Sequence, residues 1–408
     1  MKQCRSCETE IVQPLFSLGP MPLVNRFITH DQIPKEELYE LDLIYCNDCH
    51  LIQLGTTVPP TELYSNYQHL SSSSQMNLKH LDSVADYLKS HFASDGSKRL
   101  LEIGSNDGSL LQRVANIFSF AIGVDPAENL AEIANKGNIN IIPKFFSHGL
   151  ATKIKSQHGK FDTIVGLNVV PHTENFIDLL RGVEVLLTEG GHFVFEFAYV
   201  IDTIMGGDFD TIYHEHIYNF SLTSISYALK SVDLNIIDVM KIPTQGGSLR
   251  VIAQKKSAKS IPTEAVGKLL ASEKSKGHTN IDNYLAIKQN IERFKHNLLS
   301  TLKEYRDQGK TIVALGAPAR GVVVLNYCGI DTKLIDFAID DTKLKQGKLV
   351  PGVHIPVYDW SALESIDDNE VFLLVSWNYK HEVLKKLRKY QSGGTLIEYF
   401  PELKVVSL

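Results

Sequence analysis

The stretch Arg99-Leu-Leu-Glu-Ile-Gly-Ser-Asn-Asp-Gly108 decides the fold of this 408-residue chain. Its first five residues predict a buried strand, and the glycine-bounded turn that follows leads into a helix beginning near Ser109. Further strands are predicted at residues 120–125 and 161–167, and at 191–197 after a turn at Gly190-Gly191. Because helical segments separate these strands, we expect right-handed βαβ units and a parallel sheet.

The turn that starts at Gly104 is also a candidate cofactor site. Glycines let the backbone approach a ligand closely, and the N-terminus of the next helix offers free N–H donors. The pattern E-x-G-x-x-x-G favours S-adenosylmethionine over NAD, and a carboxylate at the end of the next strand can reach ribose hydroxyls. Alternatively, these glycines serve only the packing of the α/β core and bind no cofactor. The candidate cofactor residues are Glu102, Gly104, Asn106, Asp107, Gly108 and Asp125.

The cysteines point to a metal. Two C-x-x-C pairs, Cys4/Cys7 and Cys46/Cys49, offer four thiolates, which suits a closed tetrahedral structural zinc site. A redox motif would need one pair at a helix start within a βαβ unit, and neither pair lies there. Cys328 stands alone downstream and is expected to be a buried thiol.

Composition divides the chain into three expected domains, at residues 1–75, 76–255 and 256–408. The first is turn-rich, contains six prolines and would struggle to bury enough apolar surface alone. The second opens with a predicted helix over 75–92, and the third repeats the strand–turn–helix signal at 311–325. The expected fold class is α/β, with a small zinc-binding domain, a central Rossmann-like domain and a C-terminal Rossmann-like α/β domain.

The charge balance excludes some partners. Lys and Arg number 41 against 47 Asp and Glu, and the formal net charge of −6 gives no general attraction to nucleic acid or to an anionic membrane. The sequence contains no apolar run long enough for a spanning helix and no secretory signal, so we expect a cytoplasmic protein.

The run Phe209-Asp-Thr-Ile-Tyr-His-Glu-His216 is the most unusual in the chain. Histidine titrates near neutrality and a neighbouring carboxylate can bias it, so the run suggests acid–base work. A metal site in a loop and a polar helix start with satisfied histidines are the alternatives. His172 follows a predicted strand at the sheet edge where ligands bind, although a lone histidine there is more often structural.

The third domain has a weaker signal of its own. The turn Gly316-Ala-Pro-Ala-Arg-Gly321 could hold a diphosphate at a helix N-terminus, but it lacks the first glycine pair of a dinucleotide fingerprint.

Together these motifs resemble the zinc-containing, S-adenosylmethionine-dependent C-methyltransferases of nucleotide-linked deoxysugars. The resemblance spans nearly the whole chain and is carried by Cys4–Cys7, Leu18–Leu23, Cys46–Leu51, Tyr64–Tyr67, Ser71–Ser74, Glu102–Gly108, Gly123–Pro126, Asn168–His172, Phe209–His216, Gly246–Arg250, Gly316–Gly321 and Lys345–Gly352.

The resemblance implies a central class I methyltransferase domain and assigns further residues. It implies active-site positions at Tyr67, His172, Tyr213, Glu215 and His216. It adds Pro126 and Asn168 to the cofactor site. It implies that the C-terminal domain helps to hold a nucleotide-sugar, with contacts from Arg250, Gly316, Ala317, Arg320 and Lys345.

The chain departs from the family pattern at two places. Val170-Pro171 replaces the usual Leu-Ala before His172, and Arg320 replaces a lysine in the glycine turn. Since arginine binds phosphate bidentately, we expect phosphate binding to survive the second change, while specificity could differ.

The expected reaction is methylation of a carbon, at C3, next to the keto group of a nucleotide-linked 4-keto-6-deoxysugar. A base removes the C–H proton and the enolate takes the methyl group; His216 is the expected base, oriented by Glu215, while Tyr213 or His172 stabilises the enolate oxygen. Sugar O-methylation, C5-methylation and a zinc-dependent scaffold with a vestigial methyltransferase core are the alternatives. We expect a monomer or a weak homo-oligomer.

Overall fold

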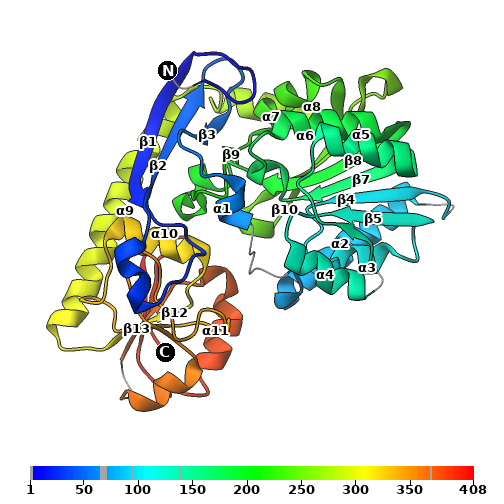
Figure 1. Ribbon diagram of the computed structural model, residues 1–408. Helices are drawn as coiled ribbons and strands as arrows, with labels where there is room; N and C mark the ends of the chain where they lie inside the picture. The colour runs from blue at the N-terminus through cyan, green and yellow to red at the C-terminus, as the bar shows by residue number, and fades with distance from the viewer. Residues whose placement is uncertain (1–2, 65–70, 94–95, 138, 368–369) are drawn as a thin grey trace.

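The computed structural model describes residues 3–408 apart from 65–70, 94–95, 138 and 368–369, and it contains three β-sheets (Figure 1). The strands are β1 (Val12–Met21), β2 (Tyr39–Cys46), β3 (Ile52–Leu54), β4 (Arg99–Ile103), β5 (Phe120–Val124), β6 (Ile141–Ile142), β7 (Phe161–Leu167), β8 (Leu187–Ala198), β9 (Tyr218–Asn219), β10 (Leu234–Ile242), β11 (Ser248–Lys255), β12 (Ile312–Leu315), β13 (Phe337–Ile339), β14 (Val357–Tyr358), β15 (Val371–Leu374), β16 (Thr395–Glu398) and β17 (Lys404–Ser407). The α-helices are α1 (Pro60–Tyr64), α2 (Gln75–Phe92), α3 (Ser109–Val114), α4 (Glu128–Lys136), α5 (His148–His158), α6 (Phe176–Leu186), α7 (Leu222–Lys230), α8 (Glu264–Ser275), α9 (Asp282–Asp307), α10 (Ala319–Cys328) and α11 (Lys380–Leu387). Short 3-10 helices include η3 (Val170–His172), η5 (Phe209–Thr211) and η9 (Trp377–Tyr379).

The central sheet has the order β10-β11-β8-β7-β4-β5-β6. Strands β4 to β8 are parallel, whereas β11 runs antiparallel to both β8 and β10. Leu100 packs on the face covered by α2, α3 and α4, and Leu101 on the face covered by α5, α6 and α7. The sheet is therefore buried on both sides, as the apolar predicted strands require (Figure 1).

Several predicted elements are confirmed here. The strands at 99–103 and 161–167 and the helix at 75–92 have the expected bounds. The turn expected at Gly190-Gly191 is wrong, because β8 starts at Leu187 and runs through both glycines.

The N-terminal sheet has the order β1-β2-β3-β9 and is more regular than the proline-rich sequence predicts. Pro14 and Pro20 are tolerated because β1 is an edge strand, and its register with β2 shifts beside both prolines. The fourth strand comes from far along the chain, since β9 pairs with β3 through Ile52 opposite Asn219 and Gln53 opposite Tyr218.

The C-terminal sheet has the order β14-β13-β12-β15-β16-β17, parallel except for the last strand. It shares a hydrophobic core with the N-terminal sheet. Leu15 and Leu43 of that sheet, Leu298 of α9 and Leu325 of α10 belong to one buried cluster. Figure 1 shows α9 alongside β1, next to the C-terminal domain. The N-terminal segment thus buries its apolar side chains against a partner domain.

These layers leave one large cavity between the domains, with a volume of about 1770 Å³. Residues that follow the carboxyl ends of β4, β5 and β7 line it, as do residues that follow β12 and β15. Carboxyl ends of parallel strands are where α/β folds bind ligands. Among the described residues, no helix is both long enough and apolar enough to cross a membrane.

Candidate active site

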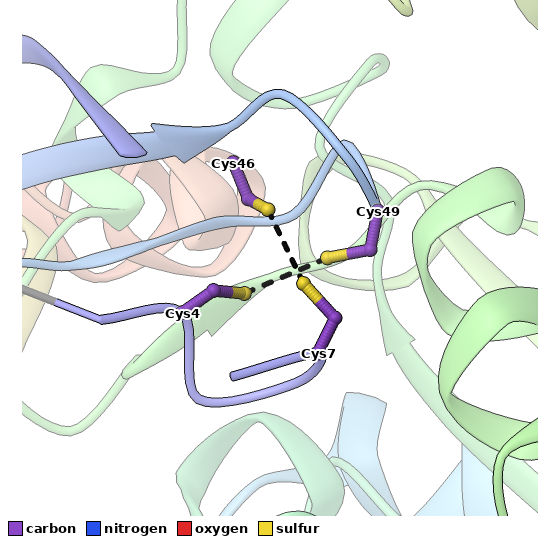
Figure 2. A group of neighbouring side chains, drawn as sticks. All are labelled: Cys4, Cys7, Cys46 and Cys49. Carbon is purple, nitrogen blue, oxygen red and sulfur yellow. Dashed lines mark hydrogen bonds between the residues drawn. The ribbon is translucent and has the colours of Figure 1, made fainter. Parts of the chain in front are cut away.

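The four paired cysteines meet at the end of the N-terminal sheet (Figure 2). The sulfur atoms of Cys4 and Cys49 lie 3.6 Å apart and those of Cys7 and Cys46 lie 3.5 Å apart. All four lie within 4.8 Å of one another. Antiparallel pairing of Val12 with Cys46 brings the two distant C-x-x-C motifs together.

The cluster fits a tetrahedral zinc ion. Zn–S bonds of about 2.3 Å imply S···S separations of about 3.8 Å, close to the two observed contacts. Glu8 and His50, each directly after a C-x-x-C motif, adopt positive φ and turn the chain around the thiols. Gln53 donates a hydrogen bond to the Cys4 sulfur at 3.2 Å, so a neighbouring side chain supports the ligand set.

The turn after β4 has the geometry of a cofactor loop. Gly104 has a φ of 70°, and a side chain there would press against Val169. The Asn106 backbone N–H donates to the carboxylate of Asp125 at 2.8 Å, which fixes the loop against the end of β5. Asp107 accepts from Ser109 and from the Ser72 backbone, so it holds the start of α3.

Two buried carboxyl groups fit S-adenosylmethionine. Glu102 Oε2 is buried without a hydrogen-bond partner among the described residues, and burial raises its pKa well above the usual value. An ammonium group such as that of the cofactor's methionine moiety would satisfy this oxygen. Burial also raises the pKa of Asp125, although its backbone hydrogen bonds oppose the shift.

Most predicted site residues line the cavity. They are Glu102, Gly104, Asn106, Asp125, Pro126, Asn168, His172, Tyr213, Glu215, His216, Arg250, Gly316, Arg320 and Lys345. Asp107, Gly108 and Ala317 lie behind its wall, where Gly108 caps α3 and the Ala317 N–H donates to Asp340. Tyr67 falls outside the described residues.

Three aromatic side chains are clustered at the centre of the site. The His216 ring lies 4.0 Å from the Tyr213 ring and 4.8 Å from the His172 ring, centroid to centroid. His216 Nδ1 donates to the Thr211 carbonyl at 2.6 Å. Because a carbonyl can only accept, Nδ1 carries the proton and Nε2 is left as the basic nitrogen.

Burial sets the charge of these groups. It lowers the pKa of His172 to about 4. It also lowers the pKa of His216 well below the ordinary value, with further lowering by the neighbouring His172. The Tyr213 pKa is raised, first by burial and then by the Glu215 charge. At neutral pH the site therefore holds two uncharged imidazoles and a protonated phenol.

Glu215 accepts a hydrogen bond from a distant part of the chain. Asn25, from the N-terminal segment, donates to Glu215 Oε1 at 2.6 Å. The contact at His216 Nδ1 is the Thr211 backbone carbonyl, and orientation of His216 by Glu215 stays a prediction. Asn25 escaped sequence reasoning because nothing in the chain around it indicates a contact with residue 215.

The three predicted cationic contacts are all paired with carboxylates. Arg320 donates through Nε to Asp210 at 2.8 Å and through Nη2 to Asp208 at 2.9 Å. Arg250 contacts Glu196 at 2.6 Å, and Lys345 contacts Asp340 at 3.2 Å. The bidentate phosphate contact expected of Arg320 is therefore not available, because two of its donor nitrogens are already used.

Two supporting residues lie beside the cavity. His80 of α2 contacts Glu196 at 2.6 Å, and Trp377 donates to Asp210 at 3.0 Å. His80 lies in no expected motif and is recognisable only through a residue distant in the sequence. Trp377 belongs to Ser376-Trp-Asn378, which follows a predicted strand where a ligand loop is expected.

Three family models match consecutive parts of the chain. They are a zinc binding domain at residues 4–64, a methyltransferase domain at 74–239 and a C-methyltransferase C-terminal domain at 243–401. The C-methyltransferase NovU from Streptomyces niveus is 30% identical over 408 residues, covering 99% of this chain and 97% of the relative. The chain belongs to this zinc-containing C-methyltransferase family. The C-methyltransferase uses S-adenosylmethionine, and its four thiols form a structural zinc site.

Solved structures resemble the C-methyltransferase only in part. Magnesium protoporphyrin IX methyltransferase from Synechocystis, with bound S-adenosylhomocysteine, is 18% identical with a TM-score of 0.35; the match covers 44% of this chain and 83% of that chain. The CcbJ methyltransferase from Streptomyces caelestis is 11% identical with a TM-score of 0.34, covering 43% and 89%.

Replacing one zinc ligand should empty the metal site. Cys49→Ser removes a thiolate, so we expect metal analysis by mass spectrometry to find most of the zinc lost and the thermal midpoint lowered by about 5 °C or more. Cys328→Ser is the matched control, because that buried thiol lies on α10 outside the cluster, and it should keep one zinc per chain. Equal zinc content in both variants would contradict the assignment.

Removing the Asp125 carboxylate should weaken cofactor binding. The variant Asp125→Ala loses both the expected ribose contact and the anchor of the Asn106 backbone. We expect calorimetry to show an affinity for S-adenosylmethionine about tenfold lower or worse. Asp82→Ala removes an exposed carboxylate on α2 that pairs with Arg113, and should leave the affinity unchanged.

Proposed function

We propose that this C-methyltransferase methylates C3 of a nucleotide-linked 4-keto-6-deoxysugar, next to the keto group. The observation that carries the proposal is the single cavity in which uncharged His216, the cofactor loop at Gly104 and the C-terminal turn at Gly316 all take part. The sugar of a nucleotide-sugar could then lie against His216, beside the cofactor, while its diphosphate contacts the turn at Gly316.

His216 is the proposed base. A C–H bond becomes acidic only beside a carbonyl group, and a neutral imidazole with a free Nε2 can then remove the proton. The proton moves to Nε2 while Nδ1–H keeps its bond to the Thr211 carbonyl, so the ring accepts charge without turning. Positioned bases of this kind contribute about 10²–10⁴-fold to rate.

Tyr213 and His172 are the proposed donors to the enolate oxygen. The raised pKa of Tyr213 keeps its hydroxyl protonated, and the ring lies directly against His216. A hydrogen bond aimed at the developing oxyanion lowers the barrier more than one made to the starting ketone. S-adenosylmethionine supplies an electrophilic methyl group. The new C–C bond forms to the enolate carbon, and the electron pair of the broken S–CH₃ bond stays on sulfur.

The C-terminal domain is proposed to hold the nucleotide diphosphate. The turn at Gly316 follows β12 and leads to α10, whose N-terminal N–H groups can bind phosphate oxygens. Gly316 has a φ of 93°, and a side chain there would overlap Ser376, so the turn requires glycine. Lys345 and Arg320 flank the same turn and remain proposed substrate contacts, Arg320 through Nη1.

Product analysis tests the proposal. The protein is incubated with S-adenosylmethionine and a panel of nucleotide-linked 4-keto-6-deoxysugars, and mass spectrometry should find one added methyl group on carbon. In deuterated water the α-hydrogen should exchange, whereas a sugar O-methyltransferase would leave it in place. His216→Asn should lower kcat by about 10²–10⁴-fold with cofactor affinity retained, and His296→Asn, on the exposed face of α9, should be neutral. Near-normal turnover by His216→Asn would contradict the role of the base.

The pH profile gives a second test. A base must be unprotonated, and burial lowers the pKa of His216 well below its ordinary value of 6.5. As the pH falls, Nε2 therefore stays available through the range in which an exposed imidazole would already be protonated. We expect kcat/KM to stay nearly flat through pH 6.5 and to fall only at lower pH. An acidic limb centred near 6.5 would contradict a buried histidine base.

A further inference from the structure

Arg320 lies where three motifs far apart in the sequence meet. Its side chain is 9% exposed and contacts Asp208, just before the histidine run at residues 209–216, and Asp210 within that run. The third motif is at Gly246, where any side chain would overlap Asp208. A buried arginine paired with two buried carboxylates is thus enclosed between the central and C-terminal domains.

Trp377 completes this cluster from the loop after β15. The Arg320 guanidinium lies 4.6 Å from the centroid of the Trp377 ring. The indole N–H of the same tryptophan donates to Asp210 Oδ2 at 3.0 Å. Asp210 therefore accepts from two residues of the C-terminal domain, and both contacts hold η5 (Phe209–Thr211) in place.

The cluster lies next in the chain to the residue whose carbonyl holds the proposed base. Asp210 is followed directly by Thr211, whose carbonyl accepts the hydrogen bond from His216 Nδ1 at 2.6 Å. Movement of Asp210 would shift that carbonyl and with it the imidazole. A displacement of about 1 Å at a reacting group can cost about 10²-fold in rate.

One hydrogen-bond donor and one acceptor of the cluster lack a partner among the described residues. Arg320 Nη1 and Asp208 Oδ1 are buried without hydrogen-bond partners among the described residues. Arg320 is the second residue of α10, immediately after the turn that begins at Gly316. A phosphate oxygen bound at this turn would lie close to the arginine that holds η5.

We propose that Arg320 is a positioning residue that joins the diphosphate-binding turn to the histidine run, so that a bound diphosphate fixes the orientation of His216. The inference rests on the proposed function for the identity of the ligand. It differs from the simple expectation that Arg320 binds phosphate, because its effect acts through Asp210 and Thr211 on the chemical step.

Kinetics separate positioning from binding. Arg320→Met should lower kcat by about 10²-fold, and KM should rise by a smaller factor because the proposed Nη1 contact is lost as well. Arg320→Lys keeps a cation for the two carboxylates and should recover about tenfold of the lost kcat. A raised KM with unchanged kcat would overturn the proposal, since it would show uniform substrate binding only. An unchanged kcat and KM would overturn it as well.

The matched control is Arg306→Met. Arg306 pairs with Asp336 in the same domain through two hydrogen bonds, but neither residue lines the cavity. It should keep kcat within about twofold, and an equal loss in both variants would overturn the proposal by showing a general effect of removing an ion pair. Asp210→Asn, which preserves side-chain size, is measured in parallel. If Arg320→Met does not fold, we expect the same loss of kcat from Asp210→Asn.

A substrate-free measurement tests the positioning of His216 by Arg320 separately from the proposed function. In protein labelled with nitrogen-15 histidine, the His216 signal is assigned by its absence from His216→Asn. The wild-type protein should show the Nδ1–H tautomer, and Asp210→Asn or Arg320→Met should show a mixture. An unchanged tautomer in a folded variant would overturn the positioning role, whereas lack of activity on every sugar would count only against the proposed function.

Discussion

The pairing of β3 with β9 is the constraint on which the rest of the site depends. The Leu54 N–H donates to the Ile217 carbonyl at 2.9 Å, directly after the histidine run. Gln53 of β3 is fully buried, and its amide contacts the Cys4 sulfur and the Arg5 backbone. The zinc knuckles, the N-terminal sheet and the end of the run at 213–216 thus form one continuous hydrogen-bonded structure. A structural metal can therefore stabilise the position of the proposed catalytic residues.

The beginning of the same run is fixed from the opposite side. There η5 contacts the C-terminal domain through Asp210, while Glu215 in the middle of the run accepts from Asn25 of the N-terminal segment. Three domains hold one short segment that has little regular structure of its own. This arrangement explains why the first and last parts of the chain share a hydrophobic core, since either part alone would leave one end of the run unsupported.

The sequence alone predicts the features that a local pattern determines, but it does not predict those that depend on contacts between distant residues. The apolar strand at 99–103, the amphipathic helix at 75–92 and the four cysteines follow from spacing alone, and the structure has them as predicted. Strand β9 has two residues and exists only because β3 lies beside it. In the same way, the partners of Glu215 and Arg320 lie far away in the chain. The sequence alone does not indicate these partners, so neither contact could be predicted from it.

That pairing has a consequence for the two proposed ligands of the cavity, which carry opposite charges. S-adenosylmethionine is a sulfonium cation and a nucleotide diphosphate is an anion, so an unpaired arginine would favour one ligand and repel the other. A carboxylate contacts each of the three cations, Arg250, Arg320 and Lys345. These pairs reduce the net positive potential at the cavity wall. The sulfonium can then bind near Glu102 while the anion relies on oriented N–H groups at the start of α10, whose partial charges act over short distances. Burial lowers the pKa of His216, so the proposed base keeps a neutral imidazole in a cavity that must also admit both charged ligands.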